Sequence, residues 1–413
     1  MNVLEKLESR FLRYAAIDTQ SAEGADQTPS TEKQLDLQRL LVREIEDLGV
    51  TDVRLTEYGF VLATVPATVE DVPRVAFLAH VDTALDYAAD NVKPIVHRNY
   101  DGQPIVLPGD PTQILDDSTA PELKNKIGDT LITSDGTTLL GADDKAGVAI
   151  IMTMVEKLIA DPTIPHGPIR ICFTPDEEIG TGISKLSLED LDADVAYTLD
   201  GETMGEVTHE SFSADKAVVT ITGVSIHPGK AKGRLVNALT LAAKFLNLLP
   251  QHTCTPETTD GREGFIHLTR MEGSSFRAEL HFILRDFERE GLESHREALR
   301  TAIGTIEKLE PRAHLDLEIA KQYRNMRYWL ENDMRPAELA IEAVRLAGVE
   351  PSSAPIRGGT DGAQLTERGL PTPNLFASIH NAHGPLEWTS IQEMKVAFDM
   401  CLHLVQLWAK ETV

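Results

Sequence analysis

Short apolar runs alternate with longer helical stretches in the first half of the chain. Residues 75–79, 169–173 and 195–199 are apolar runs of strand length, and residues 148–158 form a longer apolar stretch typical of a buried helix. Strands that alternate with helices indicate an α/β fold, in which a parallel or mixed sheet is covered by helices.

A second pattern begins near residue 211. It contains strand-like runs and amphipathic helical stretches, in the order strand 216–223, helix 235–249, strand 265–272, strand 278–287, helix 292–309 and strand 315–319. This β-α-β-β-α-β order predicts a small ferredoxin-like α+β domain.

The first pattern returns after residue 323, with a helix predicted over 336–347, a strand over 374–377 and a closing helix over 391–409. We therefore predict a discontinuous mixed-sheet domain, residues 1–210 and 326–413, with the ferredoxin-like domain of residues 211–325 inserted into it as a lid or dimerisation-type domain. The segment 91–130, rich in Pro, Asp and Gly, is predicted to be an extended excursion.

Length and charge narrow the class of protein. A chain of 413 residues exceeds the size of one hydrophobic core, so two domains are expected. The formal charge of −26 argues against binding to nucleic acid or to anionic membranes, which require a basic surface. Neither a membrane span nor a signal sequence is recognisable, and a cytoplasmic location is the default expectation.

The three cysteines, Cys172, Cys254 and Cys401, lie in or near apolar segments and none has a C-x-x-C partner. This spacing indicates neither a disulfide framework nor a thiolate zinc site. We interpret all three as inert thiols.

Acids and histidines follow the ends of the apolar runs. His80 and Asp82 come after 75–79, Asp143 and Asp144 after 139–142, Glu177 and Glu178 after 169–173, Asp200 after 195–199, and His380 and His383 after 374–377. Because ligands of open α/β sheets bind at the carboxyl ends of the strands, we expect these side chains to form one site. The neighbouring Asp176 is interpreted as a solvated or backbone-bonding turn residue.

The residue types indicate the chemistry of this site. Imidazole and carboxylate ligands without thiolate suit zinc, with cobalt or manganese as substitutes. Closely packed carboxylates repel one another, and divalent cations remove that repulsion. Two adjacent ions form a common hydrolytic centre, so the sequence predicts a metallohydrolase.

Several longer motifs support a specific family. They are His80-Val81-Asp82, GADDKAG at 141–147, PDEE at 175–178, Asp200-Gly201, GVSIHPGKAKG at 223–233, IRGGTDG at 356–362 and His383-Gly384. In this order, over nearly the whole chain, they closely resemble the di-zinc metallopeptidase family that includes carboxypeptidase G and aminoacylase, and within it the aminopeptidases that act on tripeptides.

The resemblance implies a set of metal ligands. Asp143 would bridge two zinc ions, with His80 and Asp200 completing one site and Glu178 and His383 completing the other. His380 is the alternative to His383, but the following glycine favours His383. The peptide bond after the bridging aspartate is often cis in this family.

The resemblance also implies catalytic residues. Asp82 would hydrogen-bond His80 and fix its tautomer. Glu177 would be the general base that takes a proton from a water activated by the zinc pair. His227, on the inserted domain, would stabilise the tetrahedral oxyanion.

Substrate contacts are implied for three further residues. Arg285 and Arg357 would hold the substrate carboxylate, and Asn237 would hydrogen-bond the peptide. Structural ion pairs are the alternative role for both arginines.

We therefore predict a di-zinc aminopeptidase that removes the N-terminal residue from short peptides, with tripeptides as the expected substrates. A related hydrolase for dipeptides, N-acyl amino acids or peptide C-termini is the main alternative, and a non-catalytic peptide- or metal-binding protein is a further one. Short peptides are the expected partners, nucleic acid and membranes are not, and a homodimer is possible.

Overall fold

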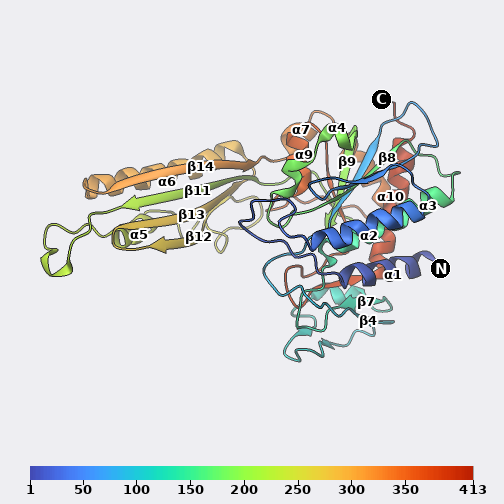
Figure 1. Cartoon of the computed structure of the whole chain (residues 1–413), viewed down its shortest axis with the longest axis horizontal. Helices are drawn as coiled ribbons and strands as arrows, with labels where there is room; N and C mark the ends of the chain where they lie inside the picture. The colour runs from blue at the N-terminus through green and yellow to red at the C-terminus, as the bar shows by residue number, and fades with distance from the viewer. Residues whose placement is uncertain (413) are drawn as a thin grey trace. The chain divides into compact units, whose positions relative to one another are not determined.

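The computed structural model describes residues 1–412, which fold as two compact units. The first unit comprises Met1–His209, Trp329–Ala354 and the chain from Thr360 onward, and the second comprises Glu210–Tyr328 and Pro355–Gly359. Figure 1 labels the main elements of both units. Among the described residues, no helix has the length and apolarity to cross a membrane.

A seven-stranded mixed sheet forms the centre of the first unit. Its strand order is β1 (Val53–Leu55), β2 (Val61–Val65), β8 (Ile169–Thr174), β3 (Val75–His80), β9 (Val195–Gly201), β15 (Asn374–Phe376) and β10 (Val207–Thr208). The four strands β8, β3, β9 and β15 are mutually parallel, whereas β1, β2 and β10 pair antiparallel with their neighbours. The predicted α/β fold with a mixed sheet is confirmed.

Helices cover both faces of this sheet. One face packs against α1 (Val3–Ala15), α2 (Gln34–Asp47), α3 (Ala142–Ala160), α8 (Arg335–Leu346) and α10 (Ile391–Trp408), and the other against η2 (Gly182–Lys185), α4 (Leu188–Leu191) and α9 (Asp361–Glu367). The short helix α7 (Arg327–Leu330) contains the point in the sequence, between Tyr328 and Trp329, where the second unit ends and the first resumes.

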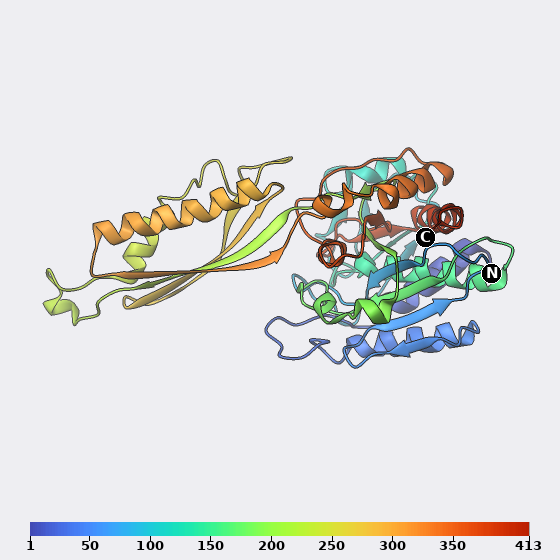
Figure 2. The same ribbon diagram turned by 90° about the horizontal axis from the view of Figure 1, so that it is seen from above.

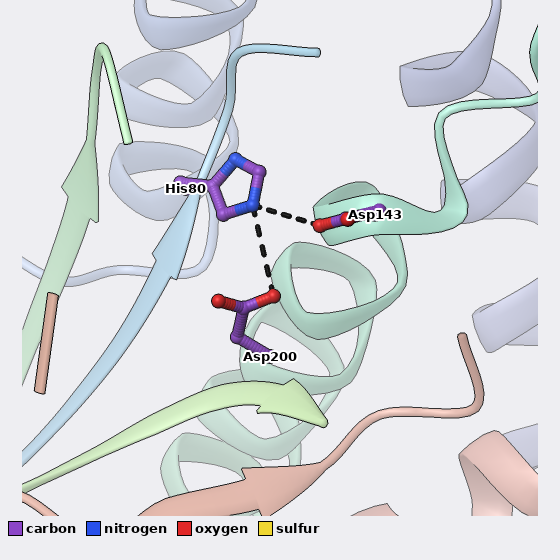
Figure 3. Close-up of side chains that lie close together, drawn as sticks. All are labelled: His80, Asp143 and Asp200. Atoms are coloured by element: carbon purple, nitrogen blue, oxygen red, sulfur yellow. Dashed lines mark hydrogen bonds and ion pairs between the residues drawn. The ribbon is translucent and has the colours of Figure 1, made fainter. Parts of the chain in front are cut away.

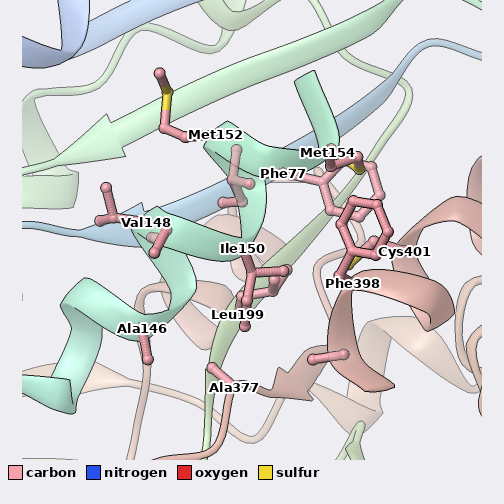
Figure 4. Packing of buried hydrophobic residues seen from close by; sticks show 14 of the residues in the cluster. Phe77, Ala146, Val148, Ile150, Met152, Met154, Leu199, Ala377, Phe398 and Cys401 are labelled. Atoms are coloured by element: carbon pink, nitrogen blue, oxygen red, sulfur yellow. The ribbon is translucent and has the colours of Figure 1, made fainter. Parts of the chain in front are cut away.

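The uninterrupted apolar residues of strand β3 are explained by burial of both of its faces. Phe77 and Ala79 join the core beneath α3 and α10, while Ala76 and Leu78 point into the smaller cluster on the opposite face. Phe77 belongs to the same packed cluster as residues of α3 and α10 (Figure 4). A strand buried on both faces has no polar positions, and His80 is its first polar residue.

Residues 91–130 form a small folded excursion rather than a structureless loop. It contains β4 (Ile95–His97), β5 (Ile105–Val106), β6 (Ile114–Leu115) and η1 (Pro121–Asn125), and β4 joins a three-stranded sheet with β7 (Leu131–Thr133) and β16 (Trp388–Ser390). Its apolar side chains pack around the buried Trp388. The sequence shows no clear period here because the strands are only two or three residues long.

The second unit has the ferredoxin-like order. Its elements are β11 (Ser213–Thr222), η3 (Pro228–Lys230), α5 (Ala238–Leu246), β12 (Phe265–Gly273), β13 (Arg277–Asp286), α6 (Arg289–Leu309) and β14 (His314–Tyr323). The strands pair antiparallel in the order β12-β13-β11-β14, and α5 and α6 pack together over the sheet. Figure 2 shows the long α6, in orange, along this sheet.

The unit ranges differ from the predicted boundaries at a few places. Residue 210, residues 326–328 and Pro355–Gly359 belong to the second unit, although the sequence analysis placed them in the first domain. The backbone N–H of Phe212 faces the carbonyls of Ile356 and Gly358 at 3.2 Å each, which attaches this segment to the start of β11. Such long-range pairing leaves no local pattern in the sequence.

Candidate metal centre

The carboxyl ends of the four parallel strands lie at one edge of the first unit's sheet. His80 is the last residue of β3, Asp200 is the penultimate residue of β9, and Glu178 and His383 follow β8 and β15. Asp143 comes from the start of α3. The topology thus brings together five residues that are far apart in the sequence.

The first group of potential ligands is His80, Asp143 and Asp200, shown in Figure 3. His80 Nε2 lies 2.9 Å from Asp143 Oδ1 and 3.7 Å from Asp200 Oδ1. The imidazole therefore points between the two carboxylates.

The second group is Asp143, Glu178 and His383. His383 Nε2 lies 3.3 Å from Asp143 Oδ2 and 3.1 Å from Glu178 Oε2. In each group the ligand atoms lie within 4.8 Å of one another. Asp143 turns one carboxylate oxygen toward each group, which is the geometry of a bridging carboxylate.

The backbone at the start of α3 fixes the position of Asp143. The Asp143-Asp144 peptide is cis, as the resemblance implies, and both residues have non-helical backbone angles. The Asp144 carboxylate accepts the backbone N–H of Gly147 at 3.2 Å and that of His80 at 3.1 Å. Asp144 therefore caps the regular part of the helix and ties it to the end of β3.

Glu387 holds the same segment from the C-terminal part of the chain. Its buried carboxylate accepts the backbone N–H groups of Leu140 at 2.7 Å, Gly141 at 2.7 Å and Asp143 at 3.0 Å. The sequence analysis did not identify Glu387. A single glutamate in front of a three-residue strand gives no sign that it binds a segment 244 residues away.

The turn after β8 separates the roles of its three acids. Asp176 has a φ of 58°, so the chain bends there and does not continue as a strand. Asp176 is buried, not solvated, and its carboxylate accepts the N–H of Ser30 at 2.7 Å, the hydroxyl of Ser30 at 2.5 Å and the amide of Gln34 at 2.7 Å. The solvated alternative for Asp176 is therefore wrong, because an N-terminal loop covers the side chain, whereas the backbone-bonding alternative agrees with its contact to the N–H of Ser30.

Asp82 contacts both the histidine and this turn. His80 Nδ1 lies 3.0 Å from the backbone carbonyl of Asp82 and 3.4 Å from its carboxylate. That carboxylate accepts the N–H groups of Glu177 at 3.0 Å and Glu178 at 3.2 Å. Its closer contacts are therefore with the turn, not with the imidazole.

Burial and mutual repulsion dominate the electrostatics of the site. They raise the pKa of Glu178 to about 7 and that of Asp200 to about 6, in both cases with Asp143 as the main repelling charge. Burial, with repulsion from Asp200 and Asp361, also raises the pKa of Glu177 well above its ordinary value. Hydrogen bonds from His383 and His80 outweigh burial at Asp143 and lower its pKa.

These features fit a pair of divalent cations. Glu178 Oε1 is buried without a hydrogen-bond partner, so one oxygen of this carboxylate is unused. The repulsion that raises the carboxyl pKa values is the kind that a bound cation removes. The donor set of imidazoles and carboxylates is one that zinc accepts.

Asp361 is a further acid at this centre to which the sequence analysis gave no role. It is buried at the start of α9, accepts the hydroxyl of Thr174 at 3.0 Å, and has a pKa raised by burial to about 7. With Glu177, Asp200 and His80 it lines a small cavity of about 10 Å³. Its place in the GGTDG motif was the available signal.

His380, the alternative to His383, is occupied elsewhere. Its Nε2 lies 2.6 Å from Glu393 Oε2, and its ring stacks on Trp388 with the ring centres 3.9 Å apart. It belongs to neither ligand group.

Two of the four other predicted site residues occupy helix starts in the second unit. His227 is exposed at the start of η3, where its Nδ1 accepts the N–H of Gly229 at 3.1 Å. Asn237 caps α5 by accepting the N–H groups of Leu239 at 3.0 Å and Thr240 at 3.2 Å.

The two predicted arginines also have contacts within the second unit. Arg285 Nη1 donates to the carbonyls of Leu284 at 3.0 Å and Asp215 at 3.3 Å and to Gln322 Oε1 at 3.0 Å. Arg357 donates to the carbonyls of Gly261, Glu263 and Thr259 and to the hydroxyl of Thr259, at 2.7–3.4 Å. A substrate carboxylate would have to compete with these acceptors.

Comparison with known proteins identifies the family. Residues 135–407 match the family model described as Peptidase family M20/M25/M40. The chain belongs to this peptidase family. The predicted family resemblance and the predicted class of enzyme, a metallopeptidase, are therefore confirmed.

Individual members of the family match over the whole length. Peptidase T of Caldanaerobacter subterraneus subsp. tengcongensis is 43% identical over 409 residues, which is 99% of this chain and 100% of that protein. The crystal structure of aminopeptidase PepT from Bacillus cereus superposes with a TM-score of 0.76 at 25% identity, over 98% of this chain and 99% of that one. A dinuclear metal binding peptidase of Bacillus subtilis shares the fold, with a TM-score of 0.68 at 16% identity over 98% of each chain.

Proposed function

We propose that this protein is a di-zinc aminopeptidase that removes the N-terminal residue from tripeptides. The observation that carries the proposal is the pair of ligand groups that share Asp143, with the carboxylate of Glu177 beside them. Full-length similarity to Peptidase T of other bacteria supports the aminopeptidase activity and the tripeptide preference.

In this proposal His80, Asp143 and Asp200 hold one zinc ion, and Asp143, Glu178 and His383 hold the other, with cobalt or manganese as substitutes. When bound, the ions supply Lewis acidity, which polarises the scissile carbonyl and makes water a stronger acid. The unpartnered Glu178 Oε1 supports this assignment of ligands.

Glu177 is proposed as the general base. Its carboxylate lines the same small cavity as His80 and Asp200 but belongs to neither ligand group, so it is available to carry a proton. Because its pKa is raised, the Glu177 carboxylate is a stronger base; it accepts a proton from the attacking water and returns it to the departing amine. Asp82 keeps the base in place by binding the N–H groups of Glu177 and Glu178.

The second unit supplies the remaining proposed residues. Exposed His227 would stabilise the tetrahedral oxyanion, and Asn237, Arg285 and Arg357 would bind the substrate, as the resemblance implies. The predicted division into a catalytic domain and an inserted lid is part of this proposal, and the cytoplasmic location and the homodimer stay predictions.

One assay compares a tripeptide, its N-acetylated form and its C-terminal amide as substrates of the zinc-loaded protein. An aminopeptidase for tripeptides releases the N-terminal residue from the free tripeptide and fails on the acetylated form. No release from any tripeptide would refute the proposal, and faster cleavage of the acetylated form would favour an N-acyl hydrolase.

The role of Glu177 is tested with Glu177→Gln. We expect kcat to fall by about 10²- to 10⁴-fold, the usual contribution of a general base, while the protein retains its two zinc ions. Glu70→Gln, a change at an exposed glutamate of the same unit, is the matched control and should leave both quantities unchanged. Unchanged kcat in Glu177→Gln would exclude this residue as the base.

A further inference from the structure

The second unit contains a cavity, with an apolar wall and a polar one, that the proposed peptidase function does not use. Its volume is about 340 Å³, and its apolar wall includes side chains from the end of α5, from β12 and from β13. Leu246, Leu249, Ile266 and Phe282 contribute to this wall, and Cys254 also lines the cavity.

Cys254 stands between this cavity and a buried histidine. Its Sγ lies 3.7 Å from Nδ1 of His295 on α6, and Nε2 of the same imidazole lies 3.2 Å from Asp286 Oδ2 at the end of β13. The side chain of His295 is only 11% exposed. Thiol, imidazole and carboxylate are therefore arranged in series, with the thiol alone reaching the cavity.

The contacts of His295 indicate which of its two ring nitrogens carries the proton in the neutral imidazole. Nε2 is close to two acceptors, Asp286 Oδ2 and the carbonyl of Arg285, each at 3.2 Å, so it carries a proton. A neutral ring therefore presents an unprotonated Nδ1 to the sulfur, and once that nitrogen has taken the thiol proton the ring is an imidazolium paired with the thiolate. Burial alone would lower the pKa of His295, but its contacts with Asp286 and Cys254 outweigh this and raise it to about 9.

The other titratable groups near the thiol come from two places in the chain. His267 on β12 and Glu257 in the loop after α5 line the cavity with Cys254. The second oxygen of Asp286 accepts the N–H of Glu288 at 2.9 Å, which fixes the carboxylate next to the imidazole.

The two other cysteines lack this arrangement. Cys172 and Cys401 are fully buried, and burial raises the pKa of both thiols. A thiol in an apolar interior is inert, whereas a partly exposed thiol beside a basic imidazole is a nucleophile.

We propose that Cys254 is a covalent modification site for small electrophiles with an apolar body, and that His295 is the base that activates it. The thiol proton moves to His295 Nδ1, and the thiolate sulfur forms a bond to one carbon of an activated carbon–carbon double bond. The electron pair of that double bond then takes the proton from His295, so the addition needs no further reactant. The interpretation of Cys254 as an inert thiol is replaced by this proposal.

The pH dependence of alkylation by N-ethylmaleimide tests the activation. For an ordinary thiol with a pKa of about 8.5, the rate falls about tenfold per pH unit below that value. In the full-length wild-type protein we expect the rate at Cys254, followed by peptide mass spectrometry, to change less than about threefold from pH 7.5 to pH 5.5. In His295→Gln we expect a fall of about 100-fold over the same range. A fall of about 100-fold in the wild type would overturn the proposal, whether or not the variant folds.

The cavity is tested by a change of reagent. N-benzylmaleimide should modify Cys254 at least about tenfold faster than N-ethylmaleimide, relative to the ratio for free cysteine, because its ring enters the apolar cavity. Cys254→Ser should abolish rapid labelling, with Cys172 and Cys401 as slow internal controls. An unchanged reagent ratio, or equal labelling of all three cysteines in the folded protein, would refute the site.

Discussion

Glu387 offers a direct test of how the metal centre is built. Its carboxylate binds three backbone N–H groups in the segment that ends at Asp143, at 2.7, 2.7 and 3.0 Å. Among the described residues, Glu387 is the only side chain that accepts hydrogen bonds from these three N–H groups. The Glu387→Ala substitution would remove it. The expected result is a looser Asp143 and a less stable first unit.

The expected magnitude follows from the number of donors. Each buried N–H that loses its acceptor costs about 1–3 kcal/mol, so three of them cost about 3–9 kcal/mol. Removing a buried carboxylate, whose pKa burial raises to about 7, returns part of this cost. We therefore expect the free energy of unfolding to fall by about 3–5 kcal/mol.

Glu387→Gln should have a smaller effect, because only one end of its amide can accept. The amide oxygen can replace the carboxylate oxygen shared by Leu140 and Gly141, and the amide NH₂ then faces the N–H of Asp143 without an acceptor. One unsatisfied donor corresponds to about 1–3 kcal/mol. The effect should therefore be intermediate.

Urea unfolding of the metal-free protein, followed by tryptophan fluorescence, measures these differences. A competition titration with a zinc chelator measures the second consequence, an affinity loss of about 10- to 100-fold, which is typical when a residue that supports a metal ligand is removed. Glu70→Ala, at an exposed position, is the control. If Glu387→Ala unfolds within about 1 kcal/mol of the wild type and binds zinc equally well, the proposed support of Asp143 is wrong.

Three further predictions concern buried charges outside the ligand set. Asp176→Ala should destabilise the protein by about 2–4 kcal/mol and lower kcat, since the contacts with Ser30 that hold the turn are lost; retained stability in urea would contradict this. Asp215→Ala should cost about 3–5 kcal/mol, because it leaves the guanidinium groups of Arg296 and Arg324 without their shared buried partner. Urea unfolding measures this, and a loss below about 1 kcal/mol would argue against that role. The pKa of His295 rises from its ordinary value of 6.5 to about 9 on folding, so its stabilisation is complete below pH 6.5 and is lost as the pH rises through about 9. Urea midpoints of His295→Gln should therefore depend less on pH between 6.5 and 9.5 than those of the wild type, and equal slopes would refute this.

Much of the architecture follows from local patterns in the sequence. Apolar runs of five residues, interrupted only by Arg170 in β8 and by a threonine in β9, predicted β3, β8 and β9 because strands buried on both faces have few polar positions. The acids and histidines at their ends predicted a site because parallel strands end at one edge of a sheet. The β-α-β-β-α-β order of residues 211–325 likewise predicted the second unit, since each element has its own period.

The sequence alone identified which residue types gather at the strand ends, but only the tertiary structure decided how they are held there. Asp176 is buried by an N-terminal loop, Glu387 binds a segment 244 residues away, and the carboxylate of Asp82 supports a turn. The series from Cys254 to His295 and Asp286 likewise joins separate elements. The periodicity of apolar residues indicates whether a position faces a core. A hydrogen bond between distant segments depends on tertiary packing, which no local pattern contains.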